Sequence, residues 1–285
     1  MFHHKSLTLI NLIIMQNEKP KFKAIADHAL LITFSDVFSE AVHSQVVALD
    51  NSITLDPPQG LIETVPAIVN LLVTFDPLIT DHLCLEKSIL NNIKNMTNNS
   101  SKGTERIVHV CYEEGFSRDL ETVSKACGLS KEAVINAHLN ENYNVLMYGF
   151  SPGYAYLSGV PKDIQVPRKI SAVRDIDAGS VIIAGSQCLV TTLKMPTGWS
   201  IIGRSPTLIL TDDLENPFLF NVGDTVNFKR IDLGTFEKMN KASNYVLCRV
   251  FYFVCRSTCY ISRYRSTRKY ALWRFSFRPN GHSIF

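Results

Sequence analysis

The sequence lacks the motifs that mark several common protein classes. No G-x-x-x-x-G-K-[ST] loop occurs, which excludes a standard P-loop nucleotide site. Ser151 does not lie in a G-x-S-x-G elbow and no acid and histidine pair accompanies it, so the pattern argues against a serine hydrolase. The apolar run of residues 7–15 is too short to cross a bilayer, which needs ~20 residues. We therefore predict no P-loop nucleotide site, no serine hydrolase site and no membrane segment.

The sequence also lacks any C-x-x-C pair. Its seven cysteines are scattered and odd in number, which is typical of free thiols in a reducing compartment and not of a disulfide framework. Cys255 and Cys259 are close together but His282 is distant from both, which makes a zinc site a weak hypothesis. We predict a cytoplasmic chain without a metal site.

Acidic residues are missing from residues 241–285, which contain seven Arg and two Lys. The rest of the chain has more acidic than basic residues, which is typical of a soluble cytosolic protein and argues against nucleic-acid binding. Basic residues interleaved with aromatics can bind single-stranded nucleic acid, but this segment has no helix cap or turn framework. We favour sequence that was not selected to fold, such as a frameshift product, and expect a poorly ordered tail at residues 236–285.

Periodicity in the remaining chain predicts two domains joined by a polar linker. Residues 19–96 follow a β-β-α-β-β-α order, with Ser35 or Asp36 as the N-cap of the first helix, which describes a small α+β domain. Residues 97–104 contain no apolar side chain and form the linker. Residues 105–235 combine short strands with tight turns, which predicts a mainly-β barrel that carries two small helices.

The first residues, 1–18, are expected to lie outside the fold. Met15 directly precedes a polar stretch, which favours a start codon assigned too early. A signal peptide is the alternative, although no small-x-small cleavage site follows the apolar run.

One segment of the second domain, DLETVSKACGLSKEAVINAH, resembles a helix-turn-helix, with Gly128 in the turn and Ser130 as the cap of the second helix. A recognition helix should offer several Arg, Lys, Asn or Gln side chains to DNA. This helix offers only Lys131 and Asn136 of those types, and a β-rich region follows it. We therefore predict no nucleic-acid partner.

The stretch from Tyr143 to Pro206 contains most of the candidate binding residues. Glycine and proline recur between short apolar runs, and aromatic residues lie beside these turns, where loops meet a surface. We predict a surface for substrate or partner recognition made of Tyr148, Phe150, Pro152, Gly153, Tyr154, Tyr156 and Trp199. The candidate oxyanion or phosphate contacts are Arg168, Arg174, Lys194 and Arg204, with solvent-facing loop cations as the alternative for each.

His138 is the best single catalytic candidate. It directly follows the helical pattern of residues 131–137. The alternative is a structural role at the helix C-terminus, where histidine can cap carbonyl groups or interact with the helix dipole.

Several sequence pieces, in this order, resemble one family. YGFSPGYAYLSG is followed by VPR, AGSV, IAGSQ, PTGW, IIGRSP and GDTVNF, and HVCYEEGFSRDLETVSKACGLSKEAVINAH stands upstream. These pieces are similar to the B-type subunit of ATP-dependent 5-oxoprolinase, the PxpB family, also called KipI-like, which includes proteins known as allophanate hydrolase subunit 1. The resemblance covers about residues 21–232.

This resemblance implies an α+β N-terminal domain followed by a cyclophilin-like barrel. It implies a hydrolase subunit with a carboxyltransferase-type domain, which opens the lactam of 5-oxoproline to glutamate only together with A-type and C-type subunits. ATP is the implied cofactor of that complex, at a site that the sequence does not locate. The alternative within the same family is a KipI-like protein that inhibits a sensor histidine kinase.

The sequence departs from the family pattern at two positions in the central stretch. Thr197 makes Pro-Thr-Gly-Trp of the usual Pro-Gly-Gly-Trp, so we expect one glycine-permitted backbone conformation to be lost. Val173 precedes Arg174 where the family has proline, which keeps the cation but not the fixed φ of proline.

Overall fold

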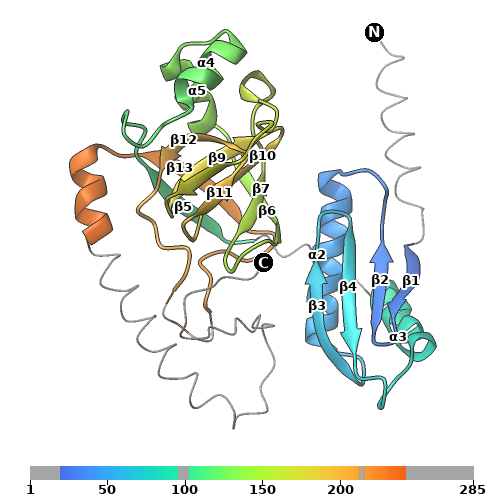
Figure 1. The fold of residues 1–285 in the computed structure, drawn as a ribbon. Coiled ribbons are helices and arrows are strands. Elements are labelled where there is room, and N and C mark those ends of the chain that lie inside the picture. Colours follow the sequence, from blue (N-terminus) through green and yellow to red (C-terminus); the bar gives the residue numbers. More distant parts are fainter. Residues whose placement is uncertain (1–19, 96–102, 212, 214–215, 242–285) are drawn as a thin grey trace, which may run out of the picture.

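The computed structural model describes residues 20–95, 103–211, 213 and 216–241 (Figure 1). The predicted extension of residues 1–18, most of the predicted linker and most of the predicted tail lie outside the described residues.

The N-terminal part is an antiparallel four-stranded sheet with the order β1-β2-β4-β3, whose helices lie on one face (Figure 1). Alternate residues of β2 and β4, such as Leu30, Ile32 and Val73, are buried against these helices, as expected for a sheet with one covered face. The elements are β1 (Lys21–Ala26), β2 (Ala29–Thr33), α2 (Glu40–Leu55), β3 (Leu61–Pro66), β4 (Asn70–Phe75) and α3 (His82–Asn95).

Helix α2 begins later than the sequence predicts. Its N-cap is Ser39, whose hydroxyl accepts a hydrogen bond from the N–H of Val42 at 3.2 Å. Ser35 instead accepts from the N–H of Val37 at 3.1 Å, in a turn before the helix. The prediction of Ser35 or Asp36 as the cap was wrong because a local turn uses the same side-chain chemistry as a helix cap.

The second part is mainly β and forms a nearly closed barrel. Its seven-stranded sheet has the order β12-β9-β10-β7-β6-β13-β5, and all its pairs are antiparallel except β13 with β5. The two ends of the sheet meet where Cys111 and Arg204 exchange backbone hydrogen bonds of 2.8 and 2.9 Å. The strands are β5 (Glu105–Val110), β6 (Tyr143–Tyr148), β7 (Ala155–Ser158), β9 (Ser180–Ala184), β10 (Gln187–Val190), β12 (Ser200–Arg204) and β13 (Thr225–Arg230).

The two predicted helices, α4 (Leu120–Cys127) and α5 (Lys131–Leu139), pack on this barrel. Gly128 ends α4 in the left-handed conformation, and the hydroxyl of Ser130 caps α5 by accepting from the N–H of Ala133 at 3.1 Å. Apolar side chains of both helices, including Val123 and Val134, belong to the barrel core. The helix pair therefore extends the barrel core.

A short ribbon covers part of the outer face of the barrel. It pairs β8 (Val173–Ile176) with β11 (Met195–Thr197), and a single 3₁₀ turn, η1 (Lys162–Ile164), precedes it. Between ribbon and barrel lies a second apolar cluster, which we call the outer cluster. Its buried members are Tyr154, Ile176, Ile182, Ala184, Leu189, Trp199 and Ile201.

Residues 233–241 form a helix after β13 (orange in Figure 1). Phe236 in this helix is buried, and its ring centroid lies 4.4 Å from that of Phe116. The predicted end of the barrel domain at residue 235 falls inside this helix, so the fold continues beyond the predicted boundary.

Candidate functional site

His138, the catalytic candidate from the sequence, is buried in the barrel core. It is 0% exposed at the end of α5, and its Nδ1 lies 2.8 Å from the hydroxyl oxygen of Tyr112. Its Nε2 lies 3.6 Å from Sγ of Cys188. Burial lowers the pKa of His138 from 6.5 to about 3, so the imidazole is neutral at pH 7. This environment supports a packing role, and the catalytic role of His138 stays a prediction.

Four predicted recognition residues form a continuous aromatic row on the outer face of the barrel. Ring centroids are 5.4 Å apart for Phe150 and Tyr154, 5.9 Å for Tyr154 and Tyr156, and 5.9 Å for Tyr156 and Trp199. Trp199 and Tyr154 are buried in the outer cluster, whereas Phe150 is 75% exposed. The aromatic row therefore runs from beneath the ribbon to the solvent.

The loop between β6 and β7 fixes the exposed end of the aromatic row. Phe150 has a φ of 69°, which residues other than glycine rarely adopt and which is often found at functional sites. Gly153 has the same φ, and a Cβ there would lie 2.7 Å from Cδ2 of Leu210. The carbonyl of Pro152 accepts a hydrogen bond from the hydroxyl of Thr192 at 2.8 Å. The backbone around Phe150 is thus held by its neighbours.

Tyr148 lies apart from the aromatic row. Its hydroxyl donates a hydrogen bond to the backbone carbonyl of Phe220 at 2.7 Å, and its ring centroid lies 5.2 Å from that of Phe218. Tyr148 packs against the barrel core instead of the outer cluster. The structure therefore separates it from the other predicted aromatic residues.

Two of the predicted cationic contacts pair with carboxylates of the chain. Nη1 of Arg204 lies 3.1 Å from a carboxylate oxygen of Asp177, and its Nε donates to the carbonyl of Ala178 at 3.2 Å. Nζ of Lys194 lies 3.6 Å from a carboxylate oxygen of Asp175, which has a φ of 57°. Arg204 in particular holds two parts of the fold together.

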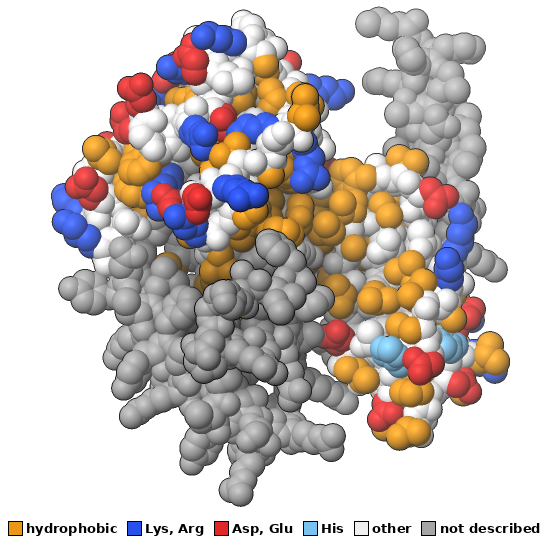
Figure 2. Space-filling model, viewed as in Figure 1, with side chains coloured by type: hydrophobic (Ala, Val, Ile, Leu, Met, Phe, Trp, Pro, Cys, Tyr) orange, Lys and Arg blue, Asp and Glu red, His pale blue; other side chains and the backbone are white. Residues whose placement is uncertain are grey.

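Arg168 and Arg174 are different, because neither forms an ion pair or a hydrogen bond with any residue that the structure describes. Both are exposed, Arg174 on the ribbon and Arg168 in the segment before it. Lys and Arg side chains gather on the barrel face seen in Figure 2. Unpaired guanidinium groups are well suited to bind carboxylate or phosphate oxygens.

The backbone around Arg168 is anchored beside Trp199. The N–H of Lys169 donates a hydrogen bond to the carbonyl of Gly198 at 2.7 Å. Nζ of Lys169 also lies 2.5 Å from a carboxylate oxygen of Asp119, and both side chains are largely buried. These contacts place Arg168 next to the inner end of the aromatic row.

Thr197 does not lose a left-handed conformation. In the described part of the chain, the only residues other than glycine with a positive φ are Phe150 and Asp175. The hydroxyl of Thr197 accepts a hydrogen bond from the N–H of Trp199 at 3.1 Å. The predicted backbone cost of this departure is therefore absent, and the threonine helps to fix the turn that carries Trp199.

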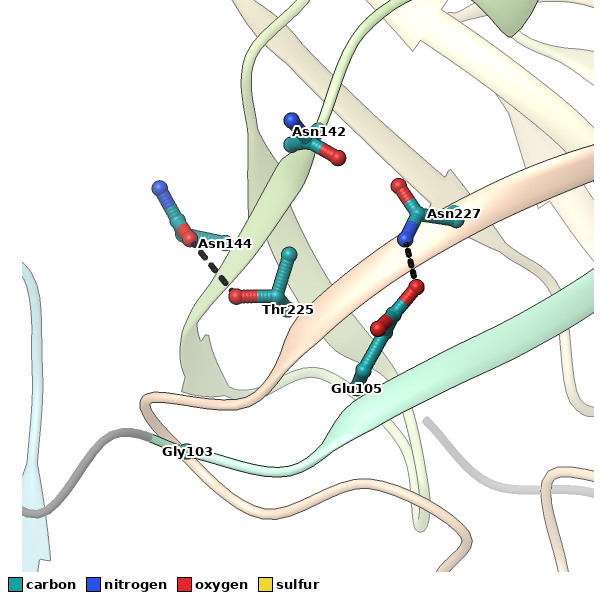
Figure 3. Close-up of a pocket in the computed structure, with 6 residues that line it drawn as sticks. All are labelled: Gly103, Glu105, Asn142, Asn144, Thr225 and Asn227. Carbon is teal, nitrogen blue, oxygen red and sulfur yellow. Dashed lines mark hydrogen bonds between the residues drawn. The ribbon is translucent and has the colours of Figure 1, made fainter.

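A polar hollow of about 370 Å³ lies on another part of the barrel (Figure 3). It is lined by Gly103, Glu105, Asn142, Asn144, Thr225 and Asn227. Nδ2 of Asn227 donates to Glu105 at 2.6 Å, and the hydroxyl of Thr225 donates to Oδ1 of Asn144 at 3.4 Å. The lining contains one carboxylate and no cation, so it does not suit a phosphate or carboxylate ligand. No residue of this hollow was among the sequence-predicted site residues, although alternation along β13 could have placed Thr225 and Asn227 on one face.

Two other findings concern the described residues alone. No three His, Cys, Asp or Glu side chains among them come together in a metal-binding arrangement. No helix among them is long and apolar enough to cross a membrane.

Comparison with known proteins gives consistent matches. The family described as "Carboxyltransferase domain, subdomain C and D" matches residues 20–220. The chain is 35% identical to the B-type subunit of the 5-oxoprolinase of Bacillus subtilis (strain 168) over 235 residues, which cover 79% of this chain and 98% of that protein.

Solved structures show the same architecture. The crystal structure of TTHA0988 matches with 29% identity and a TM-score of 0.64, covering 72% of this chain but only 40% of that longer chain. The urea carboxylase of Kluyveromyces lactis matches with 13% identity and a TM-score of 0.62, covering 85% of this chain and 25% of that chain. At this identity the second match shows a shared fold alone.

Proposed function

Because this chain belongs to the family of B-type 5-oxoprolinase subunits, we propose that it is a non-autonomous subunit of an ATP-dependent 5-oxoprolinase. The chain also belongs to the wider family of the carboxyltransferase domain, subdomains C and D. The observation that carries the proposal is the match along 98% of the Bacillus subtilis protein at 35% identity. In the proposed reaction, water adds across the amide bond of the 5-oxoproline lactam and gives glutamate, driven by ATP.

The geometry of the barrel face supports a shared site. Phe150 presents an exposed aromatic ring, and Arg168 and Arg174 present unpaired guanidinium groups on neighbouring segments. These groups can bind and orient an anionic ligand or a partner surface, as exposed aromatic and arginine side chains commonly do. We propose that A-type and C-type subunits supply the groups that perform the bond cleavage.

ATP is the cofactor of the proposed complex, and it would supply the driving force for lactam opening. Arg168 and Arg174 fit its phosphate oxygens, because their guanidinium groups have no carboxylate partner among the described residues. We further propose that the N-terminal domain is of the α+β class, that the barrel is cyclophilin-like and that the protein is cytoplasmic.

Co-expression tests the proposed function. The full chain is produced together with A-type and C-type subunits, and the release of glutamate from 5-oxoproline is measured with and without ATP. We expect ATP-dependent release only when all three subunits are present. Well-folded partners without any such release would contradict the proposal, and inhibition of kinase autophosphorylation by the chain would instead favour a KipI-like role.

A further inference from the structure

The aromatic row contains two phenol groups that the fold does not use. Neither the hydroxyl of Tyr154 nor that of Tyr156 forms a hydrogen bond with a residue in the described ranges. The buried side-chain oxygens and nitrogens that lack a partner there are those of His43, Thr74 and Ser151. Both phenol oxygens are therefore open to solvent, even though the ring of Tyr154 is packed in the outer cluster.

Arg168 lies near both phenols. The N–H bond of Lys169 to Gly198 holds this segment beside Trp199, whose ring centroid is 5.9 Å from that of Tyr156. Burial raises the pKa of both Tyr154 and Tyr156, and the positive charge of Arg168 opposes that rise in each case. Both phenols consequently stay protonated at pH 7, and each can donate one hydrogen bond.

We propose that Arg168 and the phenols of Tyr154 and Tyr156 form an oxyanion-binding subsite. Two neutral O–H donors and one unpaired guanidinium offer hydrogen bonds and positive charge without a competing carboxylate of the chain. Carboxylate and phosphate groups are the ligands that this donor set recognises. The neighbouring cations are less suitable, because Lys169, Lys194 and Arg204 each pair with an aspartate.

The identity of the anion rests on the proposed function. In that reaction the oxyanion belongs either to the carboxylate of 5-oxoproline or to a phosphate of ATP. The packed surroundings of Tyr154 preorganise its phenol, since this side chain has little freedom to lose on binding.

Binding to the full chain alone tests the subsite without any turnover. Titrations followed by NMR or calorimetry use 5-oxoproline, 2-pyrrolidone, which is the same lactam without the carboxylate, and ATP. We expect Arg168→Gln to weaken binding of 5-oxoproline or of ATP about tenfold, and the affected ligand identifies the source of the oxyanion. If the source is the carboxylate, 2-pyrrolidone binds more weakly than 5-oxoproline and is insensitive to Arg168→Gln.

Two further variants separate hydrogen bonding from general charge effects. Tyr156→Phe removes only the hydroxyl and should weaken the same ligand severalfold. Lys23→Gln removes one positive charge on exposed β1 and should leave binding unchanged. Since every variant retains residues 242–285, anion binding by the basic tail is the same in all of them.

The outcomes are distinct from those of the turnover assay. Loss of binding in Arg168→Gln supports the subsite even if no glutamate is released with partner subunits. Absence of detectable binding to the wild-type chain, or equal affinities of Arg168→Gln and Lys23→Gln for every ligand, would overturn it. In an active complex, an unchanged KM for both 5-oxoproline and ATP in Arg168→Gln would also overturn it.

Discussion

His138 and Arg204 are polar residues that the fold itself uses. His138 hydrogen-bonds with Tyr112 inside the barrel core, and Arg204 binds Asp177 across neighbouring segments. In the sequence both were candidate functional residues, His138 because it follows a helical pattern and Arg204 because it is a cation in the glycine- and proline-rich stretch. Their roles depend on partners that lie 26 or more positions away in the chain, which local patterns do not reveal.

Burial of neutral His138 should make stability depend on pH. The pKa is 6.5 for an ordinary histidine and about 3 in the folded chain, so the unfolded chain binds one more proton between these values. The contribution of His138 to the free energy of unfolding should therefore be complete above pH 6.5. It should decrease as the pH drops toward 3, by up to about 1.4 kcal/mol per pH unit. Urea unfolding at several pH values measures this slope.

The variant His138→Gln provides the comparison. It removes the titrating ring and should reduce the slope by close to one proton, while His43, whose pKa burial also lowers, remains in both proteins. Identical slopes in the two proteins would show that His138 does not control this dependence.

Gly153 and Gly185 allow backbone strain and steric overlap to be distinguished. Both have a positive φ, but a Cβ at Gly153 would meet Leu210 at 2.7 Å, whereas nothing lies within 4 Å of a Cβ at Gly185. Gly185→Ala should cost about 1 kcal/mol from strain, and Gly153→Ala about 2–4 kcal/mol, as measured by urea unfolding. Equal costs would rule out the steric contribution of Leu210.

At the scale of elements, patterns of adjacent residues predicted helix caps and turns, whereas the pairing of distant strands could not be predicted from the sequence. The cap of α5 at Ser130 and the turn at Gly128 are confirmed, and both were predictable because they depend on a few adjacent residues. The start of α2 was misplaced because Ser35 caps a turn. The pairing of β8 with β11 joins residues about 20 positions apart, so alternation alone could not show that this ribbon covers Trp199.

The candidate site was predictable only in part for the same reason. Aromatic residues beside turns identified the aromatic row, but they also included Tyr148, which packs elsewhere. Four cations in one stretch were equivalent in the sequence. Ion pairs with aspartates distinguish Lys194 and Arg204 from the unpaired Arg168 and Arg174.

Asp119 should determine how firmly the segment with Arg168 is held. Its carboxylate accepts from Lys169 at 2.5 Å and from the N–H of Ile201 at 2.8 Å. Asp119→Asn should lower stability by about 1–3 kcal/mol, because the charged partner of a largely buried lysine is lost.

Glu121→Gln is the matched control on the following helix. Glu121 pairs with Lys125 and Lys131 at the surface, where ion pairs contribute little, so no measurable change in stability is expected. A loss of stability in Glu121→Gln as large as that in Asp119→Asn would contradict the assigned role of Asp119.

At the scale of the whole molecule, two apolar cores and the outer cluster contain most of the buried apolar side chains among the described residues. The helix at residues 233–241 adds to the barrel through Phe236, which packs against Phe116. The change in composition after residue 241 suggested a boundary near this point, but Phe236 lies before that change. The folded part consequently includes residues that the sequence assigned to the tail.

Truncation tests which C-terminal residues stabilise the fold. Removal of residues 242–285 should leave the Tm unchanged, because their sequence offers no helix cap or turn framework. Removal of residues 232–285 should lower the Tm by several degrees, because Phe236 and its contact with Phe116 are lost. Thermal unfolding of both truncated proteins beside the full chain measures the difference, and equal Tm values for the two truncations would exclude a stabilising role for the helix.

The way in which the barrel closes affects how it unfolds. Ladders of two to six residue pairs join the neighbouring strands of the sheet, but the bridge of Cys111 with Arg204 joins its two ends through one residue pair. The guanidinium of Arg204 also lies 5.7 Å from the ring centroid of Phe116 and 6.0 Å from that of Phe236. The side chain of Arg204 therefore links the backbone bridge that closes the barrel to the C-terminal helix. Release of the helix should therefore loosen the barrel where a single residue pair closes it.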